Sequence, residues 1–333
     1  MTCQISGTKR NKQEVMNNSN INVKLLGIDG KLNSAFIESF RGNQFSGNDY
    51  ENMLEYAGRI CYDSFGKVNS RPSVEYLQHI VESRHTSVLG HGLIHIEWPS
   101  VDYIKEFIWN YRSEPGWYIY EQVLSVNLRF VERNLSSLYQ NYPEIVKLFA
   151  DRYPNIIEKK EVATKIELTE AKTGQHSWLN FEVSCSRSCS HELIRHSFQS
   201  SISQRSTRYV NESEFSPIIH PIAETLADET ANKINELTES LRVQIKEAYT
   251  TVISLVKEGL SMQGTATSLT KTARGAAARL LPHGLPTKIV YSVSIRELKE
   301  IINQRVVEGG VADLEIYQVA LQMQNIAKEM KFI

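Results

Sequence analysis

The stretch at residues 195–209, RHSFQSSISQRSTRY, concentrates hydrogen-bond donors in a chain whose charges are otherwise balanced. Its fifteen residues include three arginines, one histidine and five serines. Serine- and arginine-rich runs are often flexible linkers. This run, however, follows SCSHELIRH, which is typical of a short helical turn, and it precedes ordinary globular sequence. Dense arginine and serine donors inside a fold favour an anionic ligand, most often a phosphate.

The composition makes that anion site a local feature. The 333 residues allow one large domain or two, and 41% hydrophobic residues suffice to bury a core. Lysine and arginine total 37 against 38 for aspartate and glutamate, so the net charge of -1 supplies no basic field for a nucleic-acid polymer. No stretch approaches the ~18 consecutive apolar residues of a membrane span. We therefore expect a cytoplasmic protein that binds neither nucleic-acid polymer nor membrane.

The cysteines point to the same compartment. Cys3, Cys61, Cys185 and Cys189 are too few for a disulfide framework, which favours a reduced environment. Cys185 and Cys189 lack a second Cys or His pair at ligand spacing, whereas structural zinc sites usually have four ligands, so we expect packing cysteines and no metal. Residues 1–21 have no apolar signal core. We predict a disordered tail there, before a domain that spans residues 22–333.

Hydrophobic periodicity predicts the elements around the donor-rich stretch. Apolar residues recur at helical spacing in 48–62, 72–84, 228–259, 296–305 and from about 312, whereas they alternate as in strands in 93–98, 178–183 and 288–294. We interpret residues 99–177 as an inserted helical and hairpin region. One face of the long helix carries seven apolar positions: Ile234, Leu237, Leu241, Ile245, Ala248, Val252 and Val256. The pattern predicts a mixed α/β chain with long helices.

Six sequence motifs follow one another along the chain. They are HTSVLGH, SRSCSHELIRH, SQRSTRYV, ARGAAARLLPHGLPTKIV, RELKEIINQR and ADLEI. In this order, and nearly at these spacings, they resemble the motifs of flavin-dependent thymidylate synthases. The likeness covers about residues 55–98 and 178–325, and residues 99–177 resemble an insertion carried by longer members of that family.

The resemblance implies a fold and a reaction. The fold would be α/β (α+β), with a mixed sheet and long helices, in a homotetramer whose sites combine residues from several subunits. The reaction would convert dUMP to dTMP with methylenetetrahydrofolate and NADPH as co-substrates and FAD as cofactor. Such enzymes use no cysteine nucleophile on the uracil, so the protein's task is to position and polarise the reactants.

The resemblance also assigns residues. Arg305 matches the arginine that polarises the uracil, and it is taken as catalytic together with Ser206. The implied substrate-binding residues are Glu192, Arg195, Gln204, Arg205, Ser206, Thr207, Arg208 and Arg279. The implied FAD-binding residues are Ser87, Arg195, His196, Gln204, Ser294, Arg296 and Glu300. A guanidinium keeps its proton, so Arg305 would be a fixed donor to an N3-deprotonated base.

Some positions depart from the family pattern. Gly90 stands for a usual glutamate, Ser294 for a usual asparagine, and Ser197 for the second arginine of the signature. In that signature two arginines flank a histidine, and a serine follows after seven further residues; Ser206 stands one residue beyond the expected position. Arg279 lies one residue closer to the following proline than usual, a rotation of about 100° on a helix, which leaves Arg274, Arg279 or neither as the phosphate-binding arginine.

Structural interpretations stand beside these roles. Taken alone, His85 and His91 are typical of packing histidines, and Arg296 and Arg305 of a solvated helix face. Their occurrence together with SQRSTRYV favours a site instead. Four aromatic residues of the insertion form a cluster that is more typical of a core, and we assign them no site: Trp109, Trp117, Tyr118 and Tyr120.

Two further functions stay open at this point. The altered signature at Ser197 suits a related enzyme that alkylates C5 of another uracil nucleotide. Loss of flavin donors would instead leave a non-catalytic, nucleotide-binding homologue.

Overall fold

The structure is a computed structural model. It describes residues 20–38, 45–66, 71–161, 163–164, 166–172, 174–260, 264–307 and 312–333. The disordered tail predicted for residues 1–21 lies almost entirely outside the described residues.

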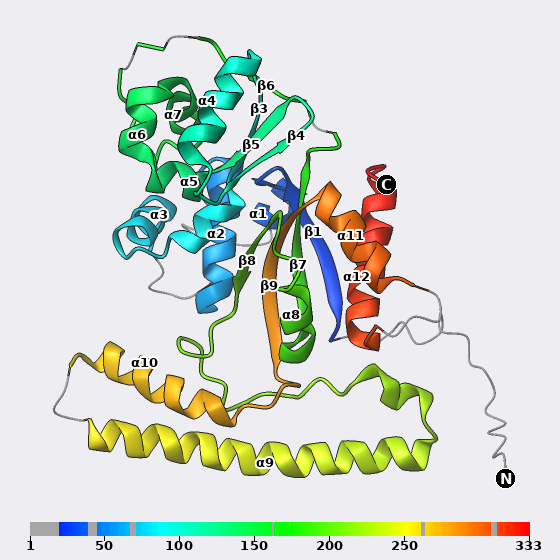
Figure 1. Cartoon of the computed structure of the whole chain (residues 1–333). Helices are drawn as coiled ribbons and strands as arrows, with labels where there is room; N and C mark the ends of the chain where they lie inside the picture. Colours follow the sequence, from blue (N-terminus) through cyan, green and yellow to red (C-terminus); the bar gives the residue numbers. More distant parts are fainter. Residues whose placement is uncertain are drawn as a thin grey trace.

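A five-stranded sheet forms the centre of the molecule, with strand order β2-β1-β7-β9-β8 (Figure 1). Its strands are β1 (Asn22–Ile28), β2 (Lys31–Leu32), β7 (Trp178–Ser186), β8 (Ser200–Gln204) and β9 (Pro286–Ser294). The predicted α/β class is confirmed. The sheet is not mixed, however, because every pairing between its described strands is antiparallel. The segment between β8 and β9 contains two long helices, and β9 then pairs antiparallel with β8 at the edge of the sheet.

Helices cover both faces of this sheet. On one face lie α8 (Arg187–Leu193), α11 (Ile295–Arg305) and α12 (Leu314–Glu329), packed on Phe181, Val183 and Tyr291 of the strands. The other face meets α2 (Asp49–Tyr62). Near α2 lie the short helix α1 (Ser34–Glu38), helix α3 (Ser73–Glu82) and the 3₁₀ turn η1 (Thr86–His91).

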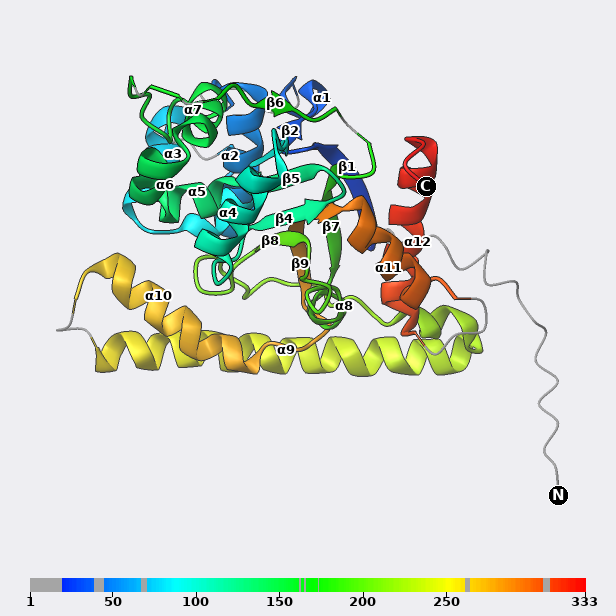
Figure 2. The ribbon, with the colours of Figure 1, turned by 45° about the horizontal axis from the view of Figure 1, so that its top comes forward.

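The insertion and the preceding strand β3 form a second sheet, with strand order β4-β5-β3-β6. A hairpin of β4 (Trp117–Tyr120) and β5 (Val123–Asn127) pairs with β3 (Leu93–Glu97), which in turn pairs with β6 (Thr169–Glu170). Four helices surround it: α4 (Val101–Tyr111), α5 (Leu128–Arg133), α6 (Leu135–Asn141) and α7 (Pro143–Arg152). The helical and hairpin character predicted for 99–177 is confirmed. Figure 2 shows that the hairpin lies over one end of the first sheet.

The predicted helices and strands outside the insertion are confirmed, but five α-helices and β-strands of the described ranges were missed. These are β1, β2, α1, α10 (Ala266–Ala277) and β8, which lies inside the donor-rich stretch itself. β8 has the sequence SSISQ, with one apolar residue, and it is an edge strand. An edge strand can expose polar side chains, so no clear alternation marks it.

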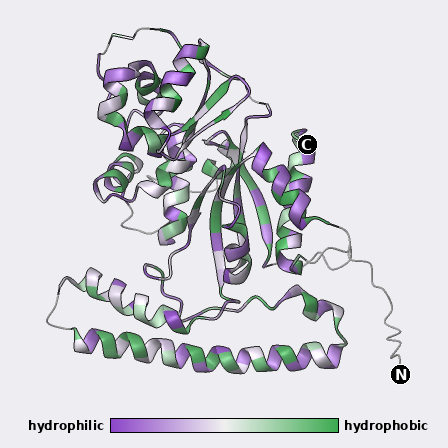
Figure 3. Ribbon diagram, in the orientation of Figure 1, coloured by the Kyte–Doolittle hydropathy of each residue, from purple (hydrophilic) through white to green (hydrophobic). Residues whose placement is uncertain are grey.

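Helix α9 (Asp228–Gly259) is 32 residues long, or about 48 Å, and it packs on α10. Figure 3 shows apolar residues along its whole length. Much of this stripe faces solvent in the single chain, since Leu237 is 63% and Leu255 61% exposed. None of the helices in the described ranges is both long and apolar enough to cross a membrane.

Candidate functional site

Four predicted residues meet at the C-terminal end of α8. Arg305 Nη2 lies 3.1 Å from Glu192 Oε2, and Arg195 Nη1 lies 3.1 Å from Glu192 Oε1. The Nε of Arg305 also donates to His196 Nε2 at 3.3 Å. We call Glu192, Arg195, His196 and Arg305 the α8 cluster.

The local sequence explains how the α8 cluster forms. Ser186 caps α8 by accepting from the backbone N–H of Cys189 at 3.1 Å, so the helix starts at Arg187 and brings Glu192 into its last turn. Ser294 caps α11 in the same way, and α11 ends at Arg305. The C-terminal ends of α8 and α11 therefore lie close enough for Glu192 and Arg305 to form an ion pair.

The electrostatics of the cluster favour a neutral imidazole. Burial lowers the pKa of His196, and the nearby Arg305 guanidinium lowers it further. His196 therefore offers Nε2 as an acceptor at neutral pH and helps to orient Arg305. The Arg195 side chain is 69% exposed, so its guanidinium extends from the protein surface.

The second group is the loop at residues 205–208, which we call the arginine loop. Ser206 N donates to the Cys61 carbonyl at 3.0 Å, and Arg208 N donates to Ser206 Oγ at 3.3 Å. The Arg205 guanidinium lies 3.3 Å from Glu212 and 3.6 Å from Asp63. Arg205 is thus paired within its own chain, whereas the Arg208 side chain is exposed.

Helix α10 lies beside the arginine loop. Arg274 donates to the carbonyl of Tyr209, while a Cβ added to Gly275 would lie 3.6 Å from Arg208 Nε. Arg279 donates to the Gly275 carbonyl at 2.9 Å and is otherwise exposed. Arg274 therefore supports the loop, and Arg279 is the freer of the two candidate arginines.

A hollow of about 210 Å³ adjoins the arginine loop. Its lining includes Arg187, His191, Thr207 and His283. The Nε of Arg187 is buried there and has no hydrogen-bond partner within the part of the chain that the structure describes. A guanidinium with an unused donor suits an anion, so this donor set fits a phosphate group.

The two groups lie at opposite ends of β8. Ser200 pairs with Val293 near the α8 cluster, and Gln204 pairs with Ile289 at the start of the arginine loop. These five residues span about 13 Å at ~3.3 Å per residue. The predicted residues of one chain therefore gather in two groups, one at each end of β8.

Comparison with known proteins assigns the chain to a family. The family model described as thymidylate synthase complementing protein matches residues 130–331, more than half of the chain. The chain belongs to the flavin-dependent thymidylate synthase family. The flavin-dependent thymidylate synthase of Mycobacterium sp. (strain JLS) is 32% identical over 271 residues, which cover 81% of this chain and 72% of that protein.

Two other flavin-dependent thymidylate synthases match in different ways. That of Mycolicibacterium gilvum is 35% identical over 149 residues, 44% of this chain, and the match spans only 56% of its own length. That of Corynebacterium diphtheriae is 24% identical over 305 residues, covering 91% of this chain and 80% of that protein.

Several residues implied by the family resemblance point inward. The Gln204 amide donates to Ser190 Oγ at 2.9 Å and to Thr287 Oγ1 at 3.3 Å, which ties β8 to α8. Ser294 is buried, donates to Gln199 Oε1 at 2.7 Å and accepts from Glu297 N at 3.0 Å. Gln204 and Ser294 therefore stabilise the strands and helices around the site. Ser87, Arg296 and Glu300 are exposed.

Sequence reasoning missed an aromatic cluster beside the arginine loop. Tyr62 hydrogen-bonds His85 Nδ1, and its ring centroid lies 4.7 Å from that of Tyr209. Lys271 Nζ lies 4.6 Å from the Tyr209 ring centroid. Tyr209 belongs to the motif SQRSTRYV, which was the only signal for this cluster in the sequence.

The glycine that replaces the family's glutamate has a steric reason. A Cβ at position 90 would lie 2.6 Å from Ser201 Oγ, which itself donates to the Gly90 carbonyl at 2.7 Å. The neighbouring His91 is fully buried, with Nδ1 2.7 Å from Ser292 Oγ and Nε2 2.9 Å from Ser203 Oγ. His91 is therefore a packing residue, and a side chain at position 90 would require the Ser201 hydroxyl to move.

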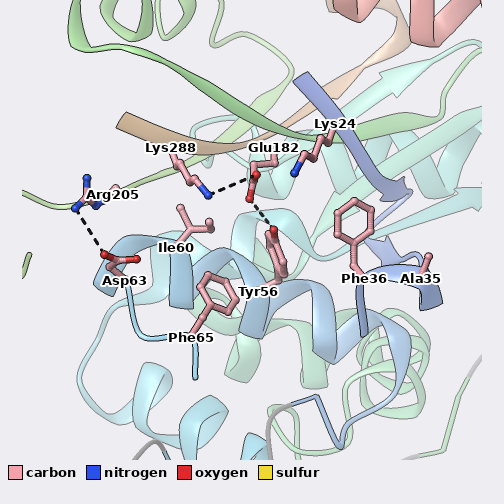
Figure 4. Close-up of a pocket in the computed structure, with 10 residues that line it drawn as sticks. All are labelled: Lys24, Ala35, Phe36, Tyr56, Ile60, Asp63, Phe65, Glu182, Arg205 and Lys288. Carbon is pink, nitrogen blue, oxygen red and sulfur yellow. Dashed lines mark hydrogen bonds and ion pairs between the residues drawn. The ribbon is translucent and has the colours of Figure 1, made fainter. Parts of the chain in front are cut away.

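A cavity of about 540 Å³ lies on the α2 side of the sheet (Figure 4). Arg205 of the arginine loop is one of its lining residues. On its floor, the buried Glu182 accepts from the Tyr56 hydroxyl at 2.6 Å and lies 3.9 Å from Lys288 Nζ. Burial raises the pKa of Tyr56 well above its usual value, and Glu182 raises it further, so Tyr56 keeps its proton.

The described cysteines are not poised as nucleophiles. Burial raises the pKa of the Cys61 thiol to about 11, and Cys185 and Cys189 are buried in the core. A protonated thiol is a poor nucleophile. Across the described ranges, no group of three or more His, Cys, Asp or Glu residues is arranged to hold a metal ion.

Proposed function

We propose that this chain is a thymidylate synthase that methylates dUMP at C5, with methylenetetrahydrofolate and NADPH as co-substrates and FAD as cofactor. The observation that carries the proposal is the pair of guanidinium groups ordered by Glu192 at the end of α8. A nucleotide presents carbonyl oxygens and phosphates, and ordered guanidinium groups bind both. The family membership supports the same reaction.

Arg305 acts on the uracil in this proposal. Its guanidinium cannot lose its proton, and Glu192 and His196 hold it in place. It is therefore a donor whose orientation costs nothing when negative charge develops on the base. Burial raises the pKa of the Cys61 and Cys189 thiols, so the residues of the chain act by positioning and polarising rather than by covalent attack.

The arginine loop binds the nucleotide phosphate in this proposal. Ser206, Thr207 and Arg208 supply donors, and Arg279 and the hollow around Arg187 extend them. Arg205 and Gln204 position the loop through their own ion pairs and hydrogen bonds.

The cofactor would be held by residues that the structure leaves at the surface. Arg195 and Arg296 are exposed guanidinium groups that suit the diphosphate of FAD, and Ser87 and Glu300 are exposed hydrogen-bonding groups. His196 and Ser294 support them from within. When bound, FAD would supply the reducing electrons for converting a methylene group to a methyl group, and NADPH would renew them.

The active form would be a homo-oligomer, with a tetramer as the expected size. The α8 cluster and the arginine loop lie at opposite ends of β8, and a complete site would join groups from neighbouring subunits. The exposed apolar stripe of α9 offers the interface. The free thiols of the described cysteines support a cytoplasmic location.

Tritium release from C5-labelled nucleotides tests the proposal. The purified protein, supplied with FAD, NADPH and methylenetetrahydrofolate, should release tritium from dUMP and form dTMP. Release from UMP but not dUMP would support an enzyme acting on another uracil nucleotide. Failure to bind flavin, or to have bound flavin reduced by NADPH, would support a non-catalytic homologue. Rescue of a thymidine-requiring bacterial strain extends the same test to cells.

A further inference from the structure

The hairpin of the insertion lies against the helix that carries Arg296. Tyr118 and Tyr120 are two residues apart on the edge strand β4, so they project from the same face. The Tyr118 ring centroid lies 6.3 Å from that of Phe198, and the Arg296 guanidinium lies 5.9 Å from the Tyr120 ring centroid. We call Tyr118, Tyr120, Phe198 and Arg296 the aromatic shelf.

Phe198 is the unusual member of the shelf. Its side chain is 68% exposed, although it stands between buried His196 and Gln199. A ring exposed to water contributes no hydrophobic stabilisation. The Phe198 ring contacts that of Tyr118, and on the same strand Tyr120 contacts the exposed Arg296. Such a combination marks a surface that a ligand or partner covers.

The shelf is continuous with the α8 cluster. Glu297, next to Arg296, has its Oε1 4.0 Å from His196 Nδ1. Tyr118 packs on Trp178 with a centroid distance of 5.5 Å, which anchors the hairpin to the start of β7. Uncharged rings therefore border the guanidinium groups of the proposed site, and this chemistry suits a flat ring joined to phosphates.

We propose that the insertion supplies one wall of the cofactor site, on which the aromatic shelf stacks a flat heteroaromatic ring of FAD. This inference rests on the proposed function, which gives the insertion no role. FAD contains two such rings, isoalloxazine and adenine, and either has the chemistry that the shelf recognises. Pairing between β8 and β9 brings Phe198 near Arg296, and the insertion's hairpin adds Tyr118 and Tyr120 beside them.

Binding of FAD to the full-length protein, followed by flavin fluorescence, tests this inference. Phe198→Ser and Tyr120→Leu should each weaken FAD binding by about 3- to 10-fold, the scale of one aromatic stacking contact. Tyr120→Phe keeps the ring and should bind as the wild type does. The matched control is Trp109→Leu, because Trp109 is an exposed aromatic residue of the same insertion with Arg112 over its ring.

The outcomes separate the inference from the proposed function. If the wild type binds FAD and both Phe198→Ser and Tyr120→Leu bind it equally well, the inference is wrong and the proposed function stands. If the wild type binds no FAD, both are overturned. Phe198 is exposed, so Phe198→Ser should leave the melting temperature of the flavin-free protein unchanged. If Tyr120→Leu misfolds, FAD binding by Phe198→Ser alone tests the inference. If the shelf variants bind FMN more weakly than the wild type does, while ADP competes with FAD equally well, the shelf holds the isoalloxazine ring. If they bind FMN equally well and ADP competes less well, the shelf holds the adenine ring.

Discussion

Arg305 Nη2 lies 3.1 Å from Glu192 Oε2, so the proposed catalytic donor is oriented by a carboxylate at the end of another helix. Replacing Arg305 with alanine should lower turnover by roughly 100-fold or more, the scale of a lost oxyanion donor. The flavin should remain bound. Steady-state kinetics with dUMP and the flavin absorbance spectrum measure the two effects, and wild-type turnover in this variant would end the assignment.

Arg208 should behave differently, because it is proposed to anchor the phosphate. Arg208→Ala should weaken nucleotide binding by about 1.5 to 3 kcal/mol, as expected for a charge-assisted hydrogen bond. The loss should appear as a raised apparent KM for dUMP with a smaller change in kcat. Ser206→Ala should be milder, and Arg112→Ala, on the surface of the insertion, should have no kinetic effect. Equal KM values for Arg208→Ala and the wild type would contradict the role.

The stripe on α9 predicts the oligomer. Leu237 and Leu241 are 63% and 47% exposed in the single chain, so a Leu237→Glu/Leu241→Glu variant should dissociate without unfolding. Light scattering coupled to size exclusion measures the mass, and circular dichroism checks the helix content. Asn235→Glu, at an exposed polar position on the same helix, is the matched control. An active, flavin-loaded wild-type monomer would rule out the shared site.

The close contact between Gly90 and Ser201 predicts a coupled pair. Gly90→Ala puts a methyl group 2.6 Å from Ser201 Oγ and should destabilise the fold by about 1 to 3 kcal/mol, as overpacking does. Ser201→Gly in the same chain removes the clashing atoms and should restore part of the loss. Urea unfolding of the four proteins in this double-mutant cycle measures the coupling. Additive effects would show that the contact is not the cause.

His91 predicts a pH dependence of stability. Burial lowers its pKa from 6.5 to about 3 in the folded protein, so the unfolded chain takes up a proton first as the pH falls. The contribution of His91 to stability is therefore complete above pH 6.5 and is lost progressively toward pH 3, by up to about 1.4 kcal/mol per pH unit. Urea unfolding at several pH values should show a shallower dependence in His91→Asn. Identical slopes would contradict this origin.

The sequence by itself determined the elements whose side chains show a strong period. Helix α9 begins and ends where its apolar repeat predicts, and β7 and β9 coincide with alternating segments. Local side-chain chemistry is enough for this, because a helix or buried strand sorts its own residues by face. The order of the motifs likewise indicated the family before any contact was known.

Tertiary structure decided what those residues do for one another. SSISQ became β8 because β9 pairs with it, and the β4–β5 hairpin reached Arg296 because β5 pairs with β3. The motif residues look alike in sequence, yet Ser294 and Gln204 bond within the chain while Arg195 and Arg208 extend to the surface. Hydrogen bonds between strands and the burial of a polar group join residues far apart along the chain. Their partners therefore follow from packing, which no local pattern records.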